Sequence, residues 1–160
     1  MKRMALFAAL IAAVSLGVVV GVGGVAGADE SGRHAAGGHG EGVLGTWLVD
    51  VQPTGDEPFQ AMLTFSPGGG LIETESTSPG TAQGSWVDRG GGRLAFTLQR
   101  FEFDEEGQPA GHVVVRGELN PVGGGRLSGP FAVDVFDPEG NIVFSGTGTA
   151  TARPFEVQPL

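Results

Sequence analysis

The sequence predicts an all-β protein: an eight-stranded antiparallel up-and-down β-barrel, preceded by a cleaved N-terminal signal peptide. One observation is an internal repeat. A Gly-Gly-Gly-Arg-Leu turn, at residues 90–94 and again at 123–127, begins a long apolar run that ends in an acidic turn, at residues 103–107 and 136–140. A second observation is the succession of short alternating runs separated by Gly, Pro, Asp and Asn. Because these runs lie between tight turns and lack a helical period, they favour consecutive antiparallel strands.

The first 28 residues have the pattern of a secretory signal peptide. Residues 1–3 are a basic start, residues 5–25 are uncharged and mostly apolar, and residues 26–28 match the small-residue site at which such leaders are cleaved. We therefore expect a secreted, extracellular protein that begins near Asp29. The apolar run approaches the length of a membrane span, so an N-terminally membrane-anchored protein is the alternative.

Residues 29–42 are predicted to form a flexible linker, because they are rich in Gly and Ala and show no apolar period. His34, His39 and Glu41 could in principle hold a metal ion. Their spacing, in a segment without a rigid frame, does not predict a metal site.

Residues 43–154 are predicted to form the barrel, and residues 155–160 a C-terminal tail. Turns rich in Gly and Pro, such as residues 67–70, 78–80 and 120–123, separate the apolar runs. Closing eight strands into a barrel leaves no strand edge unpaired. The expected strands are Val43–Val51, Pro58–Ser66, Gly70–Ser76, Thr81–Arg89, Arg93–Asp104, Gly111–Asn120, Arg126–Asp137 and Asn141–Arg153.

Alternation within the strands predicts which side chains point inward. In the sixth strand, Val113, Val115 and Leu119 should face the core, whereas His112, Arg116 and Glu118 should face solvent.

The fifth strand changes phase. Leu94, Phe96 and Leu98 are in step, but Phe101 and Phe103 are one residue out of step with them. We expect a β-bulge near residues 99–100 that would return both Phe side chains to the inner face.

Composition excludes several kinds of chemistry. The chain has no Cys and its only Lys is Lys2, so thiol nucleophiles, disulfides and Schiff-base lysines are not available to the barrel. Beyond the linker the only His is His112, which is predicted to face solvent, so a Ser–His pair is not expected. No catalytic, cofactor-binding or metal-binding residue is assigned, and an enzyme is not the favoured interpretation. The formal net charge of −9 argues against nucleic acids and anionic membranes as partners.

Two carboxylates, Glu73 and Glu75, lie two residues apart on one face of the short third strand. If Ile72 points inward, both face solvent, and this interpretation is favoured because burying unpaired carboxylates is costly. If Leu71 points inward, both enter the barrel as an acid pair with raised pKa values.

The two Trp residues lie in similar contexts, Gly45-Thr46-Trp47 and Gly84-Ser85-Trp86. A Gly-x-Trp motif that opens the first strand of an eight-strand meander resembles the calycin group of lipocalins, fatty-acid-binding proteins and avidins. The resemblance implies that Trp47 closes one end of the barrel and that Arg153, after the last strand, packs over it. The Tyr and Asn that follow the first Trp in the avidin biotin site are absent, so biotin binding is not implied. The shape also resembles that of allene oxide cyclase.

An aromatic inner face suggests a function. Between its large side chains lie Gly84, Gly117, Gly146 and Gly148, which either relieve crowding or leave room for a ligand. The leading interpretation is a secreted module that binds a small hydrophobic ligand. One alternative is an isomerase or cyclase that works through Glu73 or Glu75, and another is an extracellular domain without a ligand. The residues expected to line the binding lumen are Trp47, Phe65, Trp86, Phe96, Phe131 and Phe144.

Overall fold

The computed structural model describes residues 42–159. The predicted signal peptide (1–28) and nearly all of the predicted linker, with His34, His39 and Glu41, lie outside the described residues. In the described part of the chain, no helix is long and apolar enough to cross a membrane.

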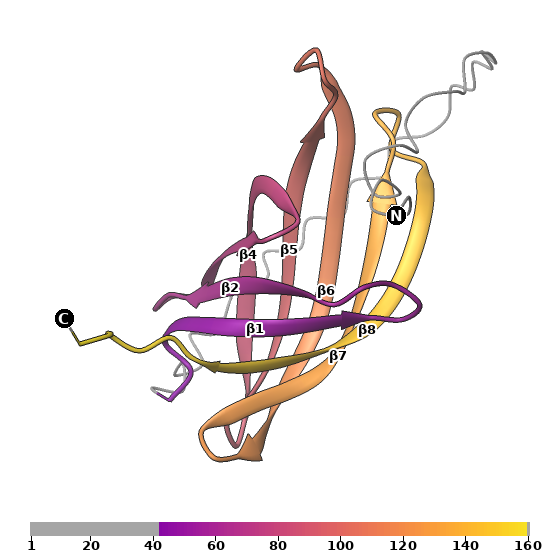
Figure 1. Ribbon diagram of the computed structural model, residues 1–160. Helices are drawn as coiled ribbons and strands as arrows, with labels where there is room; N and C mark the ends of the chain where they lie inside the picture. The colour runs from indigo at the N-terminus through magenta and orange to yellow at the C-terminus, as the bar shows by residue number, and fades with distance from the viewer. Residues whose placement is uncertain (1–41, 160) are drawn as a thin grey trace. The chain divides into compact units, whose positions relative to one another are not determined.

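Eight antiparallel strands pair in sequence order and close into a barrel, because β1 also pairs with β8. This confirms the predicted fold class. In Figure 1 the β5–β6 and β7–β8 hairpins extend past the shorter β3–β4 hairpin. The strands are β1 (Gly45–Pro53), β2 (Phe59–Phe65), β3 (Gly70–Glu75), β4 (Ser78–Gly90), β5 (Arg93–Phe103), β6 (Pro109–Gly123), β7 (Arg126–Phe136) and β8 (Ile142–Pro154).

The two ends of the barrel differ in their turns. The tryptophan end carries the start of β1 and the turns at residues 66–69, 91–92 and 124–125. The glycines of the repeated motif have positive φ values, from 66° to 82° in Gly90–Gly92 and from 61° to 88° in Gly123–Gly125. Only Gly adopts this conformation without strain, which explains why the motif recurs. The acidic-turn end carries the opposite set of turns, which includes residues 104–108.

Two expected turns are instead parts of strands. Residues 78–80 belong to β4, and the reversal is made by Ser76 and Thr77. Residues 120–123 belong to β6, which continues to Gly123. Pro79 and Pro121 are tolerated because the register of each strand pair shifts close to the proline, where no ladder hydrogen bond from its nitrogen is needed.

The hydrophobic core is concentrated toward the tryptophan end. Trp86 and Phe65 are almost completely buried, and their rings meet edge to face with centroids 5.6 Å apart. The remaining core side chains come from the inward positions of the strands. The core includes Val49, Leu63, Leu71, Ala82, Leu94, Leu98, Leu119, Leu127 and Ala152.

The prediction for the faces of β6 is confirmed. Leu119 is buried and Val115 packs against the core, whereas Arg116 and Glu118 are exposed. His112 lies on the outer face, half-buried, where its ring stacks on Phe136 with centroids 4.5 Å apart.

The predicted bulge near residues 99–100 is wrong. The pairing of β5 with β6 is continuous from Leu94 to Glu102, and the register shifts only between Glu102 and Phe103. Phe101 and Phe103 therefore point outward and are 67% and 63% exposed. Continuous alternation places Arg100 and Glu102 on the inner face instead.

Candidate functional site

Glu73 and Glu75 both enter the barrel. Leu71 is 2% exposed and Ile72 is 48% exposed, so the inward positions of β3 are 71, 73 and 75. The favoured prediction, an outward acidic face, is wrong, and the alternative with Leu71 inward is correct. The physical reason lies on β5, which brings a cation to the same interior region.

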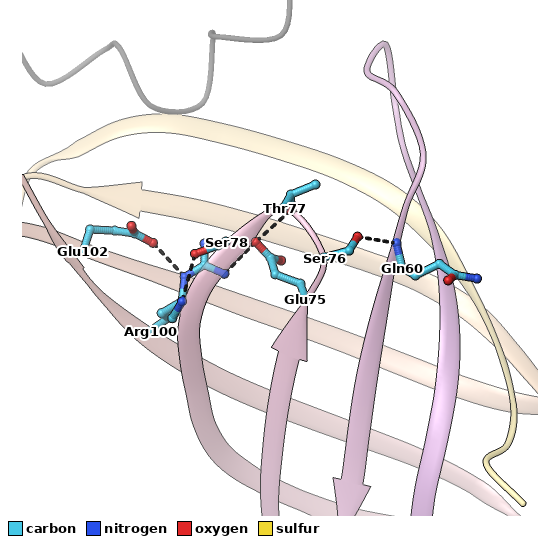
Figure 2. A network of polar contacts seen from close by, with 8 residues as sticks. Gln60, Glu75, Ser76, Thr77, Ser78, Arg100 and Glu102 are labelled. Atoms are coloured by element: carbon cyan, nitrogen blue, oxygen red, sulfur yellow. Dashed lines mark hydrogen bonds and ion pairs between the residues drawn. The ribbon is translucent and has the colours of Figure 1, made fainter.

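Arg100 forms an ion-pair network with two of the inward carboxylates, as Figure 2 shows. Its Nη1 atom lies 2.7 Å from Oε1 of Glu75, and its Nε atom donates to Oε1 of Glu102 at 2.7 Å. Thr77 also donates to Oε1 of Glu75, at 3.1 Å. Burial opposes the charge on Arg100, but the charge and hydrogen bonds of Glu75, together with those of Glu102, outweigh it and raise the pKa of the guanidinium.

Gly80 makes room for this network. A Cβ atom at residue 80 would lie 2.6 Å from Cδ and 3.1 Å from Cγ of Arg100. The aliphatic stem of Arg100 therefore passes directly over the backbone of β4. No other residue type at position 80 leaves this path open unless Arg100 moves.

Glu73 differs from its neighbours because its carboxyl group has no partner among residues 42–159. The residue is 6% exposed, and no hydrogen bond or ion pair reaches its side chain from the described part of the chain. Its neighbours across the strands are Leu63 on β2 and Ala82 on β4, which are apolar. Burial, and then the charge of Glu75, raise its pKa to about 7 against the opposing effect of Arg100.

A carboxyl group in this state has two chemical uses, ligand pairing and proton transfer. When protonated it can donate a hydrogen bond to a ligand, and when ionised it can pair with a cation or accept a proton. Both uses are open to Glu73. The described residues contain no group of three or more His, Cys, Asp or Glu that could hold a metal ion.

Five of the six predicted lumen residues come together in the core. Trp47, Phe65, Trp86 and Phe96 are buried, and Phe131 packs against them. Both indoles are satisfied locally, because Nε1 of Trp47 donates to the Val43 carbonyl at 2.9 Å and Nε1 of Trp86 donates to the Ser66 carbonyl at 3.1 Å. That any of these residues contacts a ligand stays a prediction.

The inner-face glycines accommodate aromatic rings. A Cβ atom on Gly117 would lie 2.5 Å from the Phe96 ring, and a Cβ atom on Gly148 would lie 2.5 Å from the Phe131 ring. At these two positions the glycines relieve crowding and do not leave a void.

Phe144 is the exception among the predicted lumen residues. It shares the inner face of β8 with Gly146, and its ring lies 3.0 Å from the position of a Cβ atom there. Yet 39% of Phe144 is exposed. Its neighbours across the sheet, Val135 and then Val113, are only half-buried. The inner wall of β6–β8 is therefore incompletely covered toward the acidic-turn end.

The predicted packing of Arg153 over Trp47 is wrong. Trp47 pairs with Pro154, whereas Arg153 pairs with Leu48, so the side chains of Trp47 and Arg153 leave opposite faces of the sheet. Arg153 is exposed and borders a surface hollow of about 540 Å³ together with Leu48.

A second hollow, of about 600 Å³, borders Trp47 and Pro154 at the tryptophan end. The charged residues of the two hollows, Arg126, Arg153 and Glu156, are exposed. Neither hollow is lined by a buried charged side chain, whereas Glu73 is a buried carboxyl group inside the barrel.

Arg100 and Glu102 are the functional candidates that sequence reasoning missed. The signal was the unbroken even-numbered alternation of Leu94, Phe96 and Leu98 into positions 100 and 102. Combined with the two carboxylates on the third strand, this alternation could have predicted an inward ion pair. No family model, no curated protein and no solved structure matches this chain.

Proposed function

We propose that the protein is a secreted binding module whose small ligand lies on the inner wall of β6–β8, toward the acidic-turn end of the barrel. The observation that carries the proposal is the exposure of Phe144, 39%, on an inward-facing position. Covering a partly exposed apolar side chain with a ligand is favourable by about 25 cal/mol for each Å² of apolar area removed from water.

The proposed site combines an apolar wall with a small number of polar groups. Val113, Val135 and Phe144 supply the wall, with Phe131 beneath them against the core. The Arg100 network and Glu73 supply the polar side. This composition is usual for small-molecule sites, in which apolar burial gives affinity and a few polar groups fix the orientation. It favours a ligand with a hydrophobic body and one polar group.

Binding of the uncharged hydrophobic dye Nile red tests the proposal. We expect its emission to rise and shift to shorter wavelength on addition of the protein, and Phe144→Ala to weaken this binding severalfold. The dye is preferable to intrinsic fluorescence because Trp47 and Trp86 are buried in the core. Phe101→Ala is the matched control, since it removes the same side chain from the outer face. Equal loss of binding in the two variants, or no binding at all, would refute this site.

A second candidate function is proton-transfer catalysis, of the isomerase or cyclase type. The specific observation that favours it is Glu73, whose pKa of about 7 suits a general acid or base at neutral pH. The generic probe 5-nitrobenzisoxazole tests this function, because a base removes its C3 proton while the N–O bond breaks to give a coloured phenolate. We expect a rate that rises with pH through about 7 and is lost in Glu73→Gln. Equal rates in the parent protein and this variant would remove the enzymatic interpretation.

The proposal includes export of the protein, with cleavage after Ala28. The basic start, apolar run and small-residue site of residues 1–28 support it. The intact mass of the protein from its own host tests it, because a secreted form should begin at Asp29. A mass that includes residues 1–28 would favour the membrane-anchored alternative.

A further inference from the structure

We propose that the ligand of this barrel is a cation, an organic amine with an apolar body, and that its ammonium group pairs with Glu73. This inference rests on the proposed function, since it specifies the ligand of the same site. Two observations carry it. One is the net negative charge of the inward cluster, which consists of Glu73, Glu75, Arg100 and Glu102. The other is the absence of a partner for the buried carboxyl group of Glu73 among the described residues.

The charge of the cluster selects against an anion. In the cluster of Glu73, Glu75, Arg100 and Glu102, Arg100 is the one cation, and both Glu75 and Glu102 already contact it. One guanidinium against two carboxylates leaves the network negative even while Glu73 is neutral. An anionic ligand would meet repulsion and no free donor on Arg100 Nε, whereas a cation would be attracted.

Glu73 supplies the carboxyl group with which an ammonium group could pair. A carboxyl group that is 6% exposed loses its hydration, and Glu73 gains no hydrogen bond from the described residues in return. The charged groups that act on it are Glu75 on its own strand and Arg100 on β5, while Leu63 and Ala82 flank it on β2 and β4. An ammonium group placed beside it would restore an ion pair, and the valine wall of β6–β8 would receive the apolar body.

The inference makes a measurable link between binding and protonation. Glu73 must ionise to pair with an ammonium group, and its pKa of about 7 means that it holds a proton at lower pH. Binding an amine below about pH 7 should therefore release a proton to the solvent. Binding a neutral molecule of the same shape should not.

Isothermal titration calorimetry with three matched probes tests this link: 2-naphthylmethylamine, 2-naphthylmethanol and 2-naphthoate. Titrations in buffers of different ionisation enthalpy at about pH 6 should show close to one proton released with the amine and none with the alcohol. The affinity for the amine should rise about tenfold between about pH 6 and about pH 8, because the ionised fraction of Glu73 rises by that factor. The naphthoate should bind most weakly.

Glu73→Gln should abolish the proton release and the preference for the amine, and leave the affinity for the alcohol within about twofold. Glu118→Gln, which removes an exposed carboxylate from the outer face, should change neither. If the alcohol binds as tightly as the amine and no proton is released, the inference of a cation is overturned while the proposed function stands. If none of the three probes binds, the proposed function itself is overturned. The proton release of the unsubstituted protein decides the question even if Glu73→Gln fails to fold.

Discussion

Two ion-pair networks lie on opposite faces of the barrel sheet, one between β3 and β5 inside and the other across β6, β7 and β8 outside, and their surroundings differ. On the inner face, Arg100 contacts Glu75 and Glu102, and its side chain is 14% exposed. On the outer face, Asp134 accepts hydrogen bonds from Arg116 and from Ser145, and the side chain of Arg116 is 51% exposed. Both networks lower the energy of the charges that they join. Both members of the Arg100–Glu75 pair are largely removed from water, at 14% and 15% exposure, whereas in the outer pair only Asp134 is, at 14%.

The comparison indicates that burial, more than the number of contacts, should determine how much each network contributes to the free energy of unfolding. Water reaches the outer pair through the half-exposed guanidinium of Arg116 and screens it, so the pair should contribute little to stability. In the inner network Arg100 and Glu75 depend on each other, because at 14% and 15% exposure solvent hydrates little of the group that is left behind. Four substitutions test this difference, in order of decreasing expected effect.

Arg100→Met should have the largest effect. It leaves Glu75 and Glu102 inside the barrel without their cation, and we expect a loss of about 3–5 kcal/mol in the free energy of unfolding at neutral pH. Urea denaturation of the variant and of the parent protein measures this loss. A loss below about 1 kcal/mol would mean that the inner network is solvated as freely as the outer one.

Glu73→Gln should stabilise the protein, and only at higher pH. Glu73 has a folded-state pKa of about 7 against an ordinary value of 4.5, so the folded state holds a proton that the unfolded state releases between these values. The stability of the parent protein should therefore fall as pH rises from about 4.5 to about 7, by about 3 kcal/mol in total. The variant should lack this fall. Denaturation curves at about pH 4 should coincide, whereas those at about pH 8 should differ by this amount.

Gly80→Ala should destabilise the protein by about 1–3 kcal/mol, because the new methyl group collides with the stem of Arg100. Gly70→Ala is the control, since a Cβ atom there meets only an ordinary contact at 3.8 Å. Thermal unfolding should separate the two variants clearly. In the Arg100→Met background the cost of Gly80→Ala should become smaller, and an unchanged cost would show that Arg100 is not the obstacle.

Arg116→Met should have the smallest effect. Its own guanidinium is half exposed, and its partner Asp134, whose side chain is 14% exposed, keeps the hydrogen bond from Ser145, 2.6 Å long. We expect the melting temperature to stay close to that of the parent protein, and the small difference to vanish in high salt. A melting temperature as low as that of Arg100→Met would contradict the contrast between the two faces.

The sequence was sufficient to predict eight strands, their order and the faces of β6, although residues 78–80 and 120–123 belong to strands and not to the expected turns. Turn residues and alternation are local signals, and the glycines at residues 90–92 and 123–125 require a conformation that few other residues adopt. These signals do not depend on what the strand will meet across the barrel. For that reason the closed eight-stranded meander followed from the sequence without knowledge of its contacts.

The candidate site could not be predicted in the same way, because it depends on pairs of residues from different strands. Glu75 is tolerated inside the barrel only because Arg100 lies beside it, and the two are far apart in sequence. When each strand is considered alone, a charged side chain is expected to face outward. The expected outward placement of the β3 carboxylates and the expected bulge in β5 were therefore both wrong, since each prediction left out the partner on the other strand. The prediction that Arg153 packs over Trp47 was wrong for another reason. The register of β1 with β8 decides which face of the sheet Arg153 occupies, and a shift of one residue moves its side chain to the opposite face.

Closure of the barrel by β1 and β8 also affects the order in which the chain can fold. Trp47 and Pro154, which pair at the tryptophan end, are roughly a hundred residues apart, so the contacts that seal the barrel are among the most distant in the sequence. Hairpins such as β5–β6 can form early from local contacts, but the first strand must wait until the last has been synthesised. During that interval β1 and β7 both present unpaired backbone groups, which makes the incomplete chain vulnerable to aggregation until its final strand docks.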